Sequence, residues 1–154
     1  MAVAISLHLL SAIIWVGGMF FAYMALRPAA ARVLEPPHRL SLWGATFQGF
    51  FRWVWMAVAL LVGTGYWMVF AVFGGMGGVG WHIHVMQLLG WLMIALFVYL
   101  YFGPYSALRR AVAEEAWPKA GAQLNIIRRV VAVNLCLGLL LVVIAGGGRY
   151  VAWS

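Results

Sequence analysis

The chain has 154 residues, of which 66% are hydrophobic and only 8% charged, and it carries a formal net charge of +7. A chain with so few charged side chains cannot cover its apolar surface as a soluble domain does. We therefore expect the protein to lie in the lipid bilayer. The basic residues are not gathered on one soluble face, and no nucleic-acid partner is expected.

Four apolar segments can cross a hydrocarbon core that needs about 20 residues per helix. Uncharged runs over 2–26 and 130–148 predict one span each. Residues 53–108 also lack Lys, Arg, Asp and Glu, and they are long enough for two spans joined by the glycine-rich turn at 74–78. We expect a single transmembrane domain over 1–154, with helices over 3–27, 42–73, 80–108 and 124–147.

The basic residues predict how these helices cross the membrane. Nine of the ten Lys and Arg residues lie around the first and third connections, and only Arg149 lies at the other side. The positive-inside rule makes the basic side cytoplasmic, so both termini and the glycine turn lie outside. The expected fold is an all-α membrane protein, an antiparallel four-transmembrane-helix bundle, in the bacterial inner (cytoplasmic) membrane.

Histidine is the polar residue that the membrane interior holds, because the chain has no Asp and its three Glu fall in the expected cytoplasmic loops. His8 lies about 9 Å below the outer end of the first helix. His82 and His84 lie at the start of the third helix, which begins on the same side. Residues two apart on a helix point about 200° apart, so at most one of these two faces inward.

We choose His84 as the inward histidine. Steps of three or four residues from His84 define a stripe along one helix face, with Leu88, Trp91 and Ala95. The corresponding stripe from His8 carries Ser11, Ala12, Trp15 and Gly18 or Met19. Facing each other, the two stripes would enclose a flat cofactor. His82 is then expected to be an interfacial histidine bonded to a carbonyl group or to water.

Two metals compete for these residues. A pair of imidazoles from facing helices of a four-helix bundle suits haem b, and Arg149 would either clamp a propionate or reach the lipid headgroups. Imidazole and thioether ligands equally suit Cu(I), and several methionines fall near the outer half of the bundle: Met19, Met68, Met76 and Met86. In a third reading the protein is a structural subunit whose histidines hold no cofactor.

The first helix carries Leu7-His8-Leu9-Leu10, then Trp15-Val16-Gly17-Gly18-Met19-Phe20, and then Leu26-Arg27-Pro28. It resembles the opening helix of the CopD family of copper-resistance membrane proteins and is similar to that of the HemJ type of protoporphyrinogen oxidase. The third helix, with His84, Met86, Gln87 and Gly90, resembles a related position. The HemJ pattern has a lysine where this chain has Met86 or Gln87. The resemblance implies a four-helix unit that binds haem or handles copper, and it implies that His8 is the residue to examine.

The leading hypothesis is a haem b protein with His8 and His84 as axial ligands, and with Trp15, Trp91 and Arg149 around the cofactor. It would act in electron transfer or as a membrane oxidoreductase on a quinone or porphyrin. The alternative is a copper-binding transport or resistance protein that uses His8 and His84, with His82, Met19 and Met86 as further ligands. A homodimer would suit so small a bundle, because a second copy could bury a polar residue such as Asn134.

Overall fold

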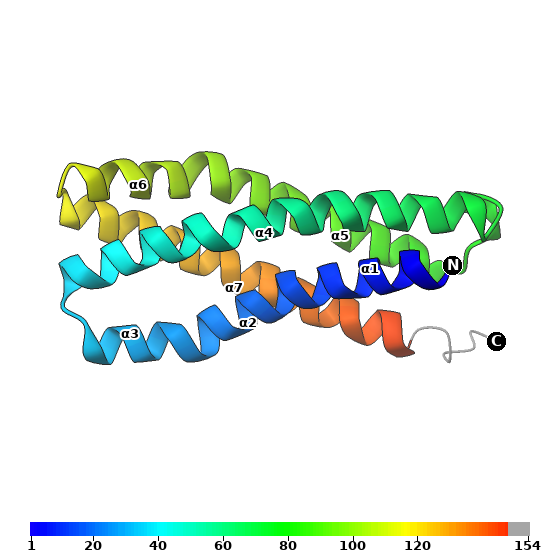
Figure 1. Cartoon of the computed structure of the whole chain (residues 1–154), viewed down its shortest axis with the longest axis horizontal. Helices are drawn as coiled ribbons and strands as arrows, with labels where there is room; N and C mark the ends of the chain where they lie inside the picture. The colour runs from blue at the N-terminus through cyan, green and yellow to red at the C-terminus, as the bar shows by residue number, and fades with distance from the viewer. Residues whose placement is uncertain (148–154) are drawn as a thin grey trace.

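The computed structural model describes residues 1–147, and its regular elements there are helices that form four long rods (Figure 1). The first rod joins α1 (Ala2–Ala12), α2 (Gly18–Phe21) and α3 (Arg27–Val33); the second is α4 (Pro36–Ala71); the third joins α5 (Trp81–Leu100) and α6 (Ser106–Ala113); and the fourth is α7 (Trp117–Gly147). Each rod is long and apolar enough to cross a membrane. The predicted four-helix membrane protein is confirmed, and the chain is a multi-pass membrane protein.

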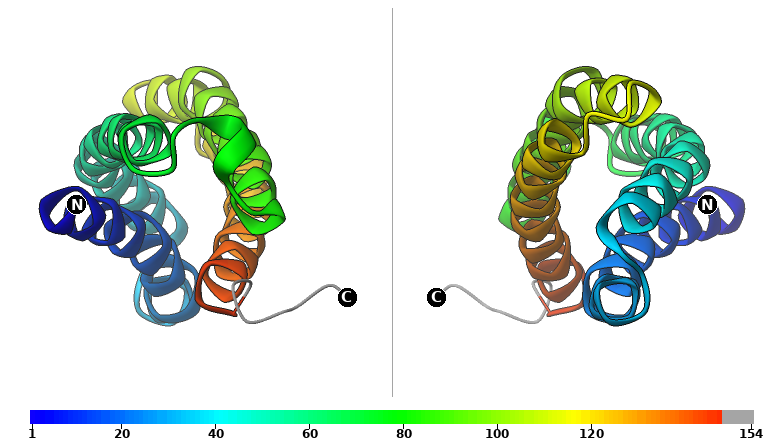
Figure 2. Two further views of the ribbon diagram at one scale, coloured as in Figure 1. Left: turned by 90° about the vertical axis from the view of Figure 1, so that its right-hand side faces the viewer. Right: turned by 90° about the vertical axis from the view of Figure 1, so that its left-hand side faces the viewer.

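Successive rods run in opposite directions. The N-terminus, the turn between α4 and α5, and the C-terminal end of α7 lie at one end of the bundle (Figure 1). We call this the N-terminal end and the opposite end, with the two remaining connections, the basic end. Seen along its long axis, the bundle is a ring in which the rods follow one another in chain order (Figure 2). Which side of the membrane each end faces stays a prediction.

At the basic end the helices extend beyond the predicted limits. The first rod continues to Val33, α4 begins at Pro36, and α7 begins at Trp117. Prolines do not stop these helices, because Pro36 and Pro118 lie in the first turn of α4 and α7, where a backbone N–H has no partner within the helix. The two connections are therefore only a few residues long.

Local breaks occur where the sequence supplies glycine or proline. Gly74 and Gly75 have φ values of 72° and 109°, which suit glycine, and they form the predicted turn ahead of the 3₁₀ turn Met76–Gly78. Pro104 lies inside a π-helical turn over Tyr101–Tyr105, where wider hydrogen bonding accommodates its missing N–H. Two similar turns, at Ile13–Gly17 and Ala22–Leu26, join the parts of the first rod.

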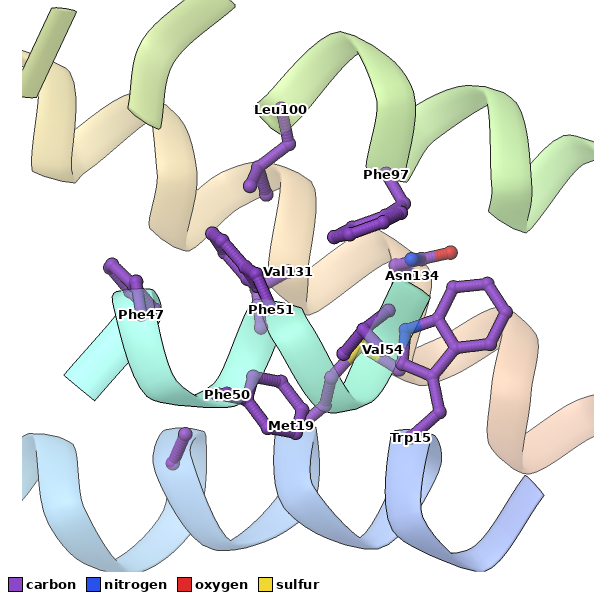
Figure 3. A pocket seen from close by; sticks show the side chains of 11 residues that line it. Trp15, Met19, Phe47, Phe50, Phe51, Val54, Phe97, Leu100, Val131 and Asn134 are labelled. Carbon is purple, nitrogen blue, oxygen red and sulfur yellow. The ribbon is translucent and has the colours of Figure 1, made fainter. Parts of the chain in front are cut away.

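Aromatic rings fill the core in the middle of the bundle and toward the basic end. The ring of Phe51 stacks on that of Phe47 with centroids 5.1 Å apart, and it makes edge contacts with Phe97 and Tyr105 at 5.4 and 4.9 Å. Side chains from all four rods enter this cluster (Figure 3). The buried residues therefore define the inward face of each rod, and this face decides where the predicted site residues point.

Candidate functional site

On the first rod, the inward stripe predicted from His8 is confirmed. Ser11, Trp15 and Met19 are only 2%, 4% and 3% exposed. His8 precedes Ser11 by one turn and Trp15 by two, so its half-buried side chain lies on the same face. The edge of the Trp15 ring contacts Phe97 of α5, with centroids 6.1 Å apart, which places this face against the third rod.

On α5, the predicted inward stripe is wrong. Met93 and Phe97 are buried, whereas Leu88 is 71% and Trp91 49% exposed, and His84 is exposed with them. Steps of three or four residues from Met93 lead back to Met86 and then to His82, which are both half-buried. His82, not His84, therefore shares the inward face. Both stripes are apolar, and in lipid an apolar stripe does not distinguish the core face from the lipid face.

His8 is held by a short hydrogen-bond chain to α4. Its Nδ1 lies 2.9 Å from Oγ1 of Thr64, and that hydroxyl donates to the carbonyl oxygen of Leu60. Because a hydroxyl has only one proton, Thr64 accepts the hydrogen bond from His8, whose Nδ1 therefore carries the proton. In this tautomer the lone pair of the neutral ring is at Nε2, the atom that would bind a ligand or metal.

Gly65 of α4 lies beside this imidazole. A Cβ atom there would lie 3.4 Å from Cε1 of His8, so the imidazole lies directly against the backbone of α4. The other inward histidine, His82, folds back over Gly80, where a Cβ would lie 2.8 Å from its Cε1. The missing Cβ at Gly80 therefore leaves space that the His82 ring occupies, whereas a Cβ at Gly65 would make only ordinary van der Waals contact with His8.

The remaining predicted site residues are in different surroundings. Trp91 donates from its Nε1 to the hydroxyl of Tyr66 at 3.2 Å, and this bond ties α5 to α4 on the outward side. Arg149 lies outside the described residues. Asn134, predicted as a residue that a second copy could bury, is already 4% exposed within one chain and donates to the carbonyl of Met93 at 3.4 Å. It lines the hollow beside Trp15 and Met19 (Figure 3).

The donor atoms limit which metal the site can hold. Within residues 1–147, no three His, Cys, Asp or Glu side chains come together as a metal site. Haem b between His8 and His84 does not fit, because His84 lies on the face of α5 opposite to the buried residues. The inward donors are two imidazoles and the thioethers of three methionines, Met19, Met86 and Met93. This is a soft set of ligands.

Comparison with known proteins agrees with the four-helix architecture. The family model described as CopD, copper resistance protein D, matches residues 44–147. The chain belongs to this family. The match covers the second, third and fourth rods of this CopD protein, while the residues of the first helix that resemble the family lie outside it. Searches of curated proteins and of solved structures found no match.

Proposed function

We propose that this CopD protein binds Cu(I) as its cargo in the N-terminal half of the bundle and serves copper transport or resistance in the bacterial inner membrane. The observation that carries the proposal is membership of the copper resistance protein D family. Imidazole nitrogen and thioether sulfur are ligands that Cu(I) prefers.

The inward donors support this function by their order along the helices. His8 and His82 lie near the N-terminal end, each within the first two turns of its helix. Met86 follows His82 by one turn, and Met93 lies about 16 Å beyond His82 along the axis of α5. Met19 lies about as far beyond His8 along the first rod as Met93 lies beyond His82 along α5. Soft donors therefore extend from the N-terminal end into the bundle, where they would receive Cu(I) and hold it away from water.

Haem b remains the competing outcome of the first experiment. Haem b would need an axial ligand other than His84 in addition to His8. The electron transfer to a quinone or porphyrin that was predicted from the sequence depends on this cofactor. The protein, purified in a neutral detergent, is expected to retain stoichiometric Cu(I) against a chromophoric Cu(I) chelator and to show no Soret band. A Soret band with split α and β bands on reduction, in a preparation without copper, would overturn the proposal.

The Thr64 hydroxyl is expected to strengthen Cu(I) binding indirectly, by orienting His8. Thr64→Val keeps the shape of the side chain but removes the acceptor for His8 Nδ1, so the ring loses its fixed tautomer and orientation. Loss of such an outer partner typically weakens metal binding about 10-fold or more. We expect that weakening in a Cu(I) competition titration, whereas Thr64→Ser, which keeps the hydroxyl, should stay near the wild-type affinity. Equal affinities for Val and Ser would contradict this role.

A further inference from the structure

A second hollow lies toward the basic end, between the first rod, α4 and α7. Its lining includes Tyr23, Arg27, Trp43 and Arg128, together with apolar side chains. None of the chain's acidic residues lines it, since these are Glu35, Glu114 and Glu115. The hollow therefore combines positive charge and hydrogen-bond donors with no carboxylate to balance them.

Two of its donors are buried without a partner. The side chain of Trp43 is 3% exposed, and its Nε1 makes no hydrogen bond. Nε of Arg128 is also buried and unpaired, although Nη1 of the same side chain donates to Oδ1 of Asn125 at 3.3 Å. Buried donors are normally satisfied, and leaving one unpaired costs about 1–3 kcal/mol. Two such donors lining one hollow indicate an acceptor that comes from outside the chain.

The charges around the hollow point to the same kind of ligand. The positive charges of Arg27 and Arg39 both act on Arg128 and repel it. The guanidinium carbon of Arg27 lies 4.8 Å from the centre of the Tyr23 ring, so this arginine is held by a ring and not by a carboxylate. Positive charges that repel one another beside an apolar core are unfavourable, and an anion between them would relieve the repulsion.

The depth of the hollow identifies the chemistry of that anion. Arg128 lies about 28 Å along α7 from Gly147, at 1.5 Å per residue. With Gly147 at one edge of a hydrocarbon core about 30 Å thick, Arg128 lies near the other edge, where the phosphate groups of lipids lie. Guanidinium groups bind phosphate oxygens through paired, charge-assisted hydrogen bonds, and basic pockets between membrane helices hold anionic headgroups.

We propose that this hollow binds a phosphate group, which Arg27 and Arg128 neutralise and to which Trp43 Nε1 donates a hydrogen bond. The source of the phosphate is either an anionic lipid or free phosphate. Neither would involve His8, His82 or Met86, which lie toward the opposite end of the bundle.

The test compares Arg128→Gln with Arg129→Gln, which removes the same charge from the next, exposed position of α7. Protein in neutral detergent is titrated with dioleoylphosphatidylglycerol, with dioleoylphosphatidylcholine, or with inorganic phosphate at constant ionic strength, and the melting temperature is followed. We expect phosphatidylglycerol to raise the melting temperature of the wild type and Arg129→Gln with affinities within twofold of each other. We expect Arg128→Gln to bind it about tenfold more weakly, the loss of one charge-assisted contact.

The titrations separate the two sources and can refute the site. Stabilisation by inorganic phosphate that depends on Arg128 in the same way identifies free phosphate as the ligand, and stabilisation by phosphatidylglycerol alone identifies the lipid. Equal losses in Arg128→Gln and Arg129→Gln, or no effect of either anion, would overturn the proposal. Should Arg128→Gln not fold, Trp43→Phe keeps the ring and removes only the donor, and unchanged phosphatidylglycerol affinity in that variant would also overturn it.

Discussion

Replacing His82 by alanine is expected to weaken Cu(I) binding about 100-fold, whereas the same change at His84 should leave the affinity within about twofold. The two histidines lie one turn or less from the start of α5 and differ in the face they occupy. His82 is half-buried on the face that carries Met86 and Met93, while His84 is exposed with Leu88. Competition with a chromophoric chelator in detergent measures both affinities under the same conditions.

Matched variants extend this test to the other donors. His8→Ala should cause a loss like that of His82→Ala, because it removes the imidazole that the first rod contributes. Met86→Leu conserves volume and should weaken binding, whereas Met56→Leu, at a position 54% exposed on α4, should not. A larger loss in His84→Ala than in His82→Ala would place the copper site on the His84 face of α5, as predicted from the sequence. It would contradict a site on the His82 face.

Gly138→Val is expected to destabilise the bundle by about 2–3 kcal/mol, the upper range for overpacking a tight contact. A Cβ atom at this position of α7 would lie 2.8 Å from Cγ2 of Val16 and 3.2 Å from Cε of Met93. Val16 is β-branched and cannot rotate away easily, so α7 would have to move away from the first rod. The measurement is the free energy of unfolding in mixed micelles of a neutral and a denaturing detergent.

Gly146→Val is the control for that prediction. Gly146 lies in the same helix, and a Cβ there would meet nothing within 4 Å. It should therefore change the free energy of unfolding by no more than about 0.5 kcal/mol, as a surface substitution does. A similar loss at both positions would mean that glycine is needed for the backbone of α7 and not for contact with Val16 and Met93.

Gly138 also shows how far composition predicts packing. Six glycines suit close helix packing, their commoner role in membrane bundles, or could leave room for a macrocycle: Gly17, Gly18, Gly63, Gly65, Gly90 and Gly138. A Cβ atom at Gly18 or Gly138 would clash with Phe50 or Val16, whereas one at Gly65 would make ordinary van der Waals contact with His8. At the other three positions a Cβ atom would meet nothing within 4 Å.

The sequence by itself determined the number of helices, their antiparallel order and the glycine turn. These follow from lengths and charges, since a hydrocarbon core admits only long uncharged segments and the charged residues must lie between them. It also predicted the inward stripe from His8, because the small and polar Ser11 and the bulky Trp15 fall on one face with it. The residues of the first helix also predicted the family to which the chain belongs.

Tertiary packing sets which face of α5 is inward, how His8 is held, and that Trp43 and Arg128 line one hollow. In a soluble bundle the apolar stripe would have marked the core face, but here the lipid-facing stripe of Leu88 and Trp91 is as apolar as the buried one. His8 hydrogen-bonds to Thr64, and the charges of Arg27 and Arg39 act on Arg128, so both interactions join positions on different rods. Their meeting depends on helix rotation and tilt, which packing sets and hydrophobic pattern in a membrane does not encode.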